Sequence, residues 1–178
     1  MKYLHTVMFV SRNKDNKNVA EFKQRSENFL TEKTPQELMQ KFHEFGERGV
    51  QGEVSRFYMS VNPRCPRKLQ LALQHHLLDN EVSFHRIEKI LCSLASKKEQ
   101  SAGRDFLFDL DVSDAEKDSF IAELENHPQI TKVEVFKTYN NWGCVTNPFH
   151  AEPLLEKFPE VELKRDEDRY IAHYKKNP

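Results

Sequence analysis

The pattern of apolar and polar positions predicts a chain that mixes short strands with helices. Runs rich in β-branched and aromatic residues predict strands at 4–10, 55–61, 106–112, 130–138, 142–147, 161–164 and 169–174. Apolar residues at three- and four-residue spacing predict helices at 19–30, 67–78, 83–95 and 152–158. The two kinds of element alternate along the chain, which is typical of an α+β protein.

Two further helices are predicted by their starts. Thr34 is followed three residues later by Glu37, and Ser113 by Glu116. In such a capping box the hydroxyl accepts from a backbone amide of the first turn, and the glutamate reaches back to the amide of the cap residue. We therefore expect one helix to begin after Thr34 and another after Ser113.

The order of these elements predicts a mainly antiparallel sheet with helices, in a ferredoxin-like or RNA-recognition-motif (RRM)-like core. From residue 106 the order is strand, helix, two strands, helix and strand, which matches that arrangement. We expect residues 55–178 to form this RRM-like core domain. Residues 1–54 are expected to form an N-terminal α/β extension packed on it.

Composition narrows the classes of function. Of the 178 residues 38% are hydrophobic and 31% are charged, yet the net charge is only −1, so no general attraction to nucleic acid or membrane is implied. No apolar run approaches the roughly 18 residues that cross a membrane, so no membrane partner is expected. The three cysteines form no Cys-x-x-Cys pair, which favours a reducing cytoplasmic location, in a host cell if the protein is viral.

The main candidate for chemistry is the strand 106–112, in which two carboxylates are spaced two residues apart. Asp109 and Asp111 are predicted to share one face of the strand, with Phe108 and Leu110 on the other. A divalent cation such as Mg²⁺ or Mn²⁺ relieves the repulsion between two such carboxylates, and it prefers oxygen ligands. The alternative is a solvated strand end that leads into the next helix.

A second polar stretch follows in the hairpin 135–149. Lys137, Thr138, Asn140 and Asn141 can contact a phosphate or a sugar. The alternative is an ordinary hairpin with asparagines in its turn, since asparagine tolerates positive φ.

Basic residues gather near the strand 55–61 and near the end of the chain. Arg56, Arg64 and Lys68 accompany the first, and Lys164 and Arg165 the second. If these segments neighbour the acidic strand, they supply positive charge for a triphosphate or a nucleic-acid backbone beside metal ions. The alternative is a solvated surface whose charges are balanced elsewhere.

An acidic strand, a helix, a polar hairpin and a late strand with Asp together resemble the archaeo-eukaryotic primase superfamily, in particular its phage-type members. The resemblance covers roughly residues 55–174. It implies that Asp109 and Asp111 are catalytic carboxylates that hold Mg²⁺ or Mn²⁺, and that a third carboxylate, Asp166 or Asp168, completes the metal site.

The same resemblance assigns the hairpin to nucleotide phosphate. Thr138, Asn140 and Asn141 match the start of its motif, and Pro148-Phe149 matches the end. The chain departs from the family at Gly143, where a phosphate-binding histidine is expected.

Three functional hypotheses follow. The first is a metal-dependent, primase-like nucleotidyltransferase that acts on nucleotides or nucleic acid in DNA replication. The second is a non-catalytic nucleic-acid-binding or protein-binding module of viral origin on the same fold. The third is an RNA-recognition-like binder that stacks bases on Phe57, Tyr58 or Trp142.

Overall fold

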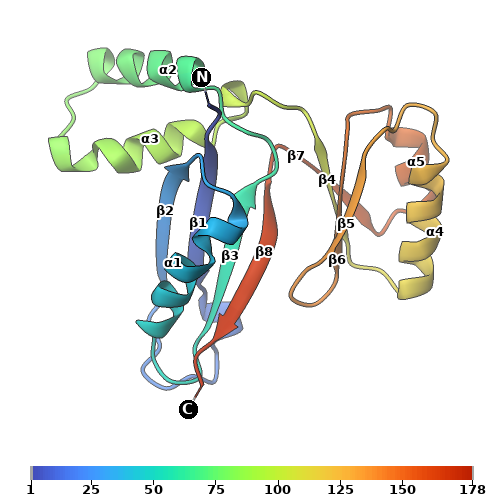
Figure 1. The fold of residues 1–178 in the computed structure, drawn as a ribbon, viewed down its shortest axis with the longest axis horizontal. Helices are drawn as coiled ribbons and strands as arrows, with labels where there is room; N and C mark the ends of the chain where they lie inside the picture. The colour runs from blue at the N-terminus through green and yellow to red at the C-terminus, as the bar shows by residue number, and fades with distance from the viewer. Residues whose placement is uncertain (1, 178) are drawn as a thin grey trace.

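Two antiparallel sheets of four strands each organise residues 2–177, the part of the chain that the computed structural model describes (Figure 1). Met1 and Pro178, the outer ends of the two predicted domains, lie outside that range. Five α-helices accompany the sheets within it. The α+β class and the mainly antiparallel pairing predicted from the sequence are confirmed.

The first sheet is built by the two ends of the chain. Its strands are, in spatial order, β2 (Arg25–Thr31), β1 (His5–Ser11), β3 (Val54–Ser60) and β8 (Asp168–Lys175). Helix α1 (Pro35–Glu47) packs on one face, where Phe42 and Phe45 meet Phe9 and Phe57 of the strands. These rings lie with centroids 5.0–5.8 Å apart and tilted or edge-on, as aromatic rings prefer.

The second sheet contains the acidic strand. The chain runs through β4 (Phe106–Leu110), α4 (Asp114–Glu125), β5 (Val133–Lys137), β6 (Trp142–Thr146), α5 (Glu152–Lys157) and β7 (Val161–Arg165). The spatial order β5-β6-β4-β7 with antiparallel pairing is the ferredoxin-like, RRM-like arrangement that the sequence predicts. Helices α4 and α5 cover the face turned away from the first sheet (Figure 1), so the opposite face looks toward the first sheet.

A helical hairpin closes the outer edge of the first sheet. Helices α2 (Pro66–Asp79) and α3 (Ile87–Ala95) pack through Leu69 and Leu94 against Leu30 of β2. A short 3-10 helix, Phe84–Arg86, precedes α3. The predicted helices 67–78 and 83–95 are thereby confirmed to within a few residues.

The predicted helix at 19–30 is wrong, because strand β2 occupies its second half. Phe29 packs edge-on against Phe9 of β1, with ring centroids 5.3 Å apart, and neighbouring side chains alternate between the two faces. The spacing of Phe22, Phe29 and Leu30 fitted a helix equally well, and pairing with β1 over seven residues decided the outcome.

The predicted division at residue 54 does not follow the strand pairing. Strand β3 pairs with β1 and with β8, so it belongs to the same sheet as the first strands of the chain. The ferredoxin-like unit occupies residues 106–165, and the last strand, β8, returns to the first sheet. Composition gave no sign of this, because β3 and β4 are both short apolar strands.

The loop that follows β3 forms hydrogen bonds with both segments of the chain that connect the two sheets. The side chain of Asn62 donates to the carbonyl of Asp105 (2.9 Å) and accepts from its amide (2.8 Å). Arg64 donates from Nη1 to Asp166 Oδ2 at 2.6 Å. Because residue 105 leads into β4 and residue 166 leaves β7, this loop sets how the second sheet faces the first.

Candidate ligand-binding cleft

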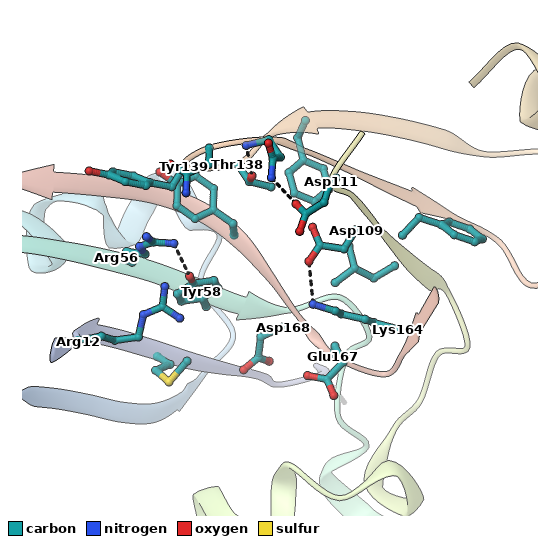
Figure 2. Close-up of a pocket in the computed structure, with 18 of the residues that line it drawn as sticks. Arg12, Arg56, Tyr58, Asp109, Asp111, Thr138, Tyr139, Lys164, Glu167 and Asp168 are labelled. Carbon is teal, nitrogen blue, oxygen red and sulfur yellow. Dashed lines mark hydrogen bonds and ion pairs between the residues drawn. The ribbon is translucent and has the colours of Figure 1, made fainter. Parts of the chain in front are cut away.

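A cleft of about 410 Å³ lies between the two sheets, on the face of the first sheet opposite α1 (Figure 2). The first sheet and its loops contribute Met8, Arg12, Lys14, Arg56, Tyr58 and Tyr170. The second sheet contributes Leu107, Phe108, Asp109, Asp111, Phe136, Thr138, Tyr139, Asn140, Asn141, Gly143 and Lys164, and the connecting turn contributes Glu167 and Asp168. Figure 2 shows that Arg12 and Arg56 lie toward one end and the carboxylates toward the other.

Two arginines and one aspartate form the first end, here called the arginine end (Arg12, Asp15 and Arg56). Asp15 accepts from Arg12 Nε at 3.0 Å and also from Arg56 Nη2. Arg56 is 8% exposed, and its Nε has no hydrogen-bond partner among residues 2–177. Two guanidinium groups share a single carboxylate, so this end keeps a positive charge, to which Lys14 adds.

Tyrosines line the cleft beside these arginines. The guanidinium carbon of Arg56 lies 4.3 Å from the ring centroid of Tyr139, and the rings of Tyr58 and Tyr170 meet edge-on at 5.9 Å. Burial raises the pKa of Tyr170 to about 12, although the nearby charge of Arg56 acts in the opposite direction. Its hydroxyl, 2.6 Å from His173 Nδ1, therefore stays protonated at neutral pH.

The acidic end is formed by Asp109, Asp111, Glu167 and Asp168, together with Lys164. Asp109 accepts from Lys164 Nζ at 2.8 Å. Asp111 accepts from the side-chain amide of Asn141. Asp109 and Asp111 both line the cleft, which agrees with the predicted shared face, and the side chains of Phe108 and Leu110 are fully buried in the core beneath α4 and α5.

Two pKa shifts describe the electrostatics of this end. Burial raises the pKa of Asp168 above its ordinary value, and the hydrogen bond from Thr6 and the charge of Arg64 only partly oppose it. For Lys164, burial favours the neutral form, but the hydrogen bond and charge of Asp109, with the charge of Glu162, outweigh it and raise the pKa. Lys164 is therefore a permanent ammonium group at neutral pH.

The expected three-carboxylate metal site is not assembled by the described residues. Asp166 lies outside the cleft and forms a buried ion pair with Arg64, the two side chains being 7% and 2% exposed, which corrects its assignment as a metal ligand. Asp168 is the candidate that lines the cleft. Among residues 2–177, however, no group of three or more His, Cys, Asp or Glu side chains is arranged to hold a metal ion.

The structure brings together some of the predicted phosphate-binding residues and separates others. Those that line the cleft are Arg56, Thr138, Asn140, Asn141 and Lys164. Those that lie elsewhere are Arg64, Lys68, Lys137 and Arg165. Strand β3 does not pair with β4 as the basic cluster required, and Arg56 lies at the end of the cleft away from the acidic pair.

The predicted phosphate-binding residues that do not line the cleft make contacts elsewhere in the structure. Arg64 is held by Asp166, and Lys68 and Arg165 line a separate hollow of about 600 Å³ beside the linker to β4. The ammonium of Lys137 lies 5.9 Å from the ring centroid of Trp142, away from the lining of the cleft.

Sequence reasoning missed several residues of the cleft, namely Arg12, Lys14, Tyr139, Glu167 and Tyr170. Arg12 and Lys14 directly follow β1, and basic residues at a strand end are a weak sign of such a role. Of the predicted base-stacking residues only Tyr58 lines the cleft, because Phe57 is fully buried under α1 and the indole of Trp142 donates to Asp114.

The position at which the resemblance expects a histidine is closed by a neighbouring ring. A Cβ added to Gly143 would lie 2.5 Å from the Cζ atom of Phe136, on the adjacent strand β5. The ring of Phe136 therefore occupies the space into which a side chain at position 143 would project.

No helix of residues 2–177 combines the length and apolar character needed to span a membrane. Comparison with known proteins gives no significant match to any protein family, curated protein or solved structure.

Proposed function

We propose that the cleft binds a nucleotide or a single strand of nucleic acid, as a non-catalytic module. The observation that carries this proposal is Arg56, which is buried at the arginine end and lines the cleft, and whose Nε has no partner in the described part of the chain. A buried polar group without a partner is costly, and a phosphate oxygen is a strong acceptor for a guanidinium.

The arrangement around Arg56 supports a phosphate at this end. Arg12 and Arg56 both form ion pairs with the carboxylate of Asp15. Two planar guanidinium groups from neighbouring segments therefore lie close together. Their shared charge is only partly neutralised, which favours a dianion. The low net charge of the chain does not oppose this, because a local cluster is sufficient for one phosphate.

The tyrosines support a base next to that phosphate. Tyr58, Tyr139 and Tyr170 line the cleft, and the ring of Tyr139 lies beside the guanidinium of Arg56. Stacking on an aromatic ring contributes about 1–3 kcal/mol per base and tolerates any base. The carboxylates and amides at the far end can accept from or donate to the polar edge of a base or a sugar hydroxyl.

The test is binding of a nucleoside triphosphate and of a short labelled single strand, measured by titration calorimetry and fluorescence anisotropy. Arg56→Gln removes one charge-assisted hydrogen bond and should weaken binding about tenfold or more. Arg86→Gln is the matched control, since Arg86 is exposed on the distant 3-10 helix before α3 and should change affinity little. Equal affinities of the two variants, or no binding by the wild type, would refute the proposal.

A second candidate function is metal-dependent nucleotidyl transfer, which the side-by-side placement of Asp109 and Asp111 in the cleft favours. If it holds, the wild type extends a labelled primer or joins nucleotides in the presence of Mn²⁺. The variant with both aspartates replaced by asparagine should then lose all activity. If the wild type forms no product with any template or nucleotide, nucleotidyl transfer is refuted and only the binding function remains.

The cellular setting is part of the same proposal. The described cysteines, Cys65, Cys92 and Cys144, are all free thiols. This agrees with the reducing cytoplasm that the sequence predicts, that of a host cell if the protein is viral.

A further inference from the structure

We propose that the ammonium group of Lys164 is the resident counter-ion of the acidic end, so that ligands bind in this cleft without a divalent cation. The inference deepens the proposed function, on which it rests for the class of ligand. It assigns to Lys164 the charge that a metal ion supplies in the superfamily that the sequence resembles.

Strand register places Lys164 beside the acidic pair. On β7, Lys164 lies opposite Leu107 of β4, and Glu162 lies opposite Asp109. Lys164 therefore projects from the same face as Leu107 and Asp109, as a diagonal neighbour of Asp109. The Nζ–Oδ2 distance of 2.8 Å is that of a charge-assisted hydrogen bond, and both side chains are 32% exposed.

The second carboxylate is also satisfied from within the chain. Asp111 accepts from the side-chain amide of Asn141, and the backbone amide of Asn141 in turn donates to Thr138 Oγ1 at 3.0 Å. The hairpin turn is thus tied to Asp111. Each aspartate of the pair has its own partner, a cation for Asp109 and an amide for Asp111.

A metal ion and this lysine compete for the same oxygen. Mg²⁺ requires about six oxygen ligands at roughly 2.0–2.1 Å. An ammonium already bound to Asp109 takes one ligand and repels a second cation, because like charges a few ångströms apart disfavour each other strongly in a partly buried site. The 2.8 Å contact between Lys164 Nζ and Asp109 Oδ2 keeps this positive charge at the carboxylate.

The lysine also serves the ligand directly. An ammonium has three donors, and Asp109 uses one of them, while Glu162 lies 3.6 Å away. Lys164 therefore keeps donors for the polar edge of a base or a sugar hydroxyl at this end, while Arg12 and Arg56 offer their charge to a phosphate at the other. The ligand expected from this arrangement is a phosphorylated compound free of metal, such as a nucleotide or a nucleic-acid strand that places a phosphate at the arginine end and a base or sugar at the acidic end.

The test compares Mn²⁺ uptake by the wild type and by Lys164→Glu, with electron paramagnetic resonance and titration calorimetry. The wild type should bind no Mn²⁺ in the cleft, and its affinity for the labelled strand should be equal in Mg²⁺ and in EDTA. Lys164→Glu places a third carboxylate on the pair and should bind Mn²⁺ at least about tenfold more tightly than the wild type. Adding Asp109→Asn to that variant should abolish the gain.

The controls keep folding and function apart. Thermal melts by circular dichroism show whether each variant folds. If Lys164→Glu does not fold, Lys164→Gln, which removes only the charge, should show the same gain in smaller measure. Mn²⁺ uptake by the wild type that Asp109→Asn removes, or no gain in a folded Lys164→Glu or Lys164→Gln, would overturn the inference. Failure of the wild type to bind any nucleotide or strand would refute the proposed function instead, and the Mn²⁺ comparison would still stand.

Discussion

Leu110 holds the acidic strand against the helices of its sheet. Its side chain is fully buried in the cluster that contains Phe108, Phe120 and Leu124. Leu110→Asp would bury a charge without a partner, so we expect no cooperative unfolding transition for this variant. Leu110→Ala should lower the free energy of unfolding by about 2–5 kcal/mol in urea denaturation.

Leu71 provides the control for this prediction. It lies on α2 and is 50% exposed. Leu71→Asp should lower the free energy of unfolding by less than about 1 kcal/mol. Near-wild-type melting of Leu110→Asp would show that the core of the second sheet lies elsewhere.

The titration of one carboxyl group, that of Asp168, should make the stability of the protein depend on pH. Because burial raises its pKa in the folded state above the ordinary 3.8, the folded protein binds this proton more readily than the unfolded chain. The stability contributed by Asp168 is therefore full below 3.8 and is lost as the pH rises through the raised value.

Asp168→Asn should accordingly raise the thermal midpoint at about pH 7, and the gain should shrink as the pH falls toward about 3. In the wild type Thr6 Oγ1 donates to Asp168 Oδ1 at 3.1 Å, and the side-chain oxygen of the asparagine can accept the same hydrogen bond. Scanning calorimetry of both proteins across this range measures the effect. A gain that grows in acid would reverse the sign and contradict the burial argument.

The helix starts are the clearest features at the scale of the element. In α1 the hydroxyl of Thr34 accepts from the amide of Glu37, and the carboxylate of Glu37 accepts from Thr34 in return. Ser113 and Glu116 repeat this capping box at the start of α4. Thr34→Ala and Ser113→Ala should each lower the free energy of unfolding by about 1 kcal/mol.

Acid should weaken these caps. Hydrogen bonds from the backbone and hydroxyl of Thr34 lower the pKa of Glu37, so its contribution is present above the ordinary 4.5 and is lost as the pH falls through the lowered value. The difference between wild type and Thr34→Ala in denaturant midpoint should therefore shrink in acid. Thr34→Ser keeps the hydroxyl and should stay close to the wild type. A constant difference at every pH would mean that the glutamate takes no part.

The buried pair of Arg64 and Asp166 acts at the scale of the whole molecule, because it joins the loop after β3 to the turn between β7 and β8. Removing one partner of such a pair typically costs about 3–5 kcal/mol, since the other charge is left buried. We expect Arg64→Leu to lower the free energy of unfolding by that amount in urea.

The double variant Arg64→Leu, Asp166→Asn tests the reason for that loss. Asp166 has a φ of 62°, a conformation that asparagine tolerates, so no new backbone strain is added. The double variant should be more stable than Arg64→Leu alone. In either variant, small-angle scattering should show that the orientation of one sheet relative to the other varies more than in the wild type. Additive losses would mean that the two charges do not depend on each other.

Much of this molecule follows from the sequence by itself. The capping boxes, the amphipathic helices and the order of elements from residue 106 depend on neighbouring residues, so they predict α1, α4 and the ferredoxin-like unit. The shared face of Asp109 and Asp111 follows equally from the two-residue period of a strand.

Tertiary structure alone decided the rest. The chain forms β2 where a helix was expected, it places β3 and β8 in one sheet, and it brings Arg12 and Tyr170 to the cleft. It also pairs Asp109 with Lys164, 55 residues later in the chain, and separates Asp166 from both. The physical reason is that local periodicity reports which face of an element is apolar, whereas the partner of that face is chosen by the packing of all the elements together.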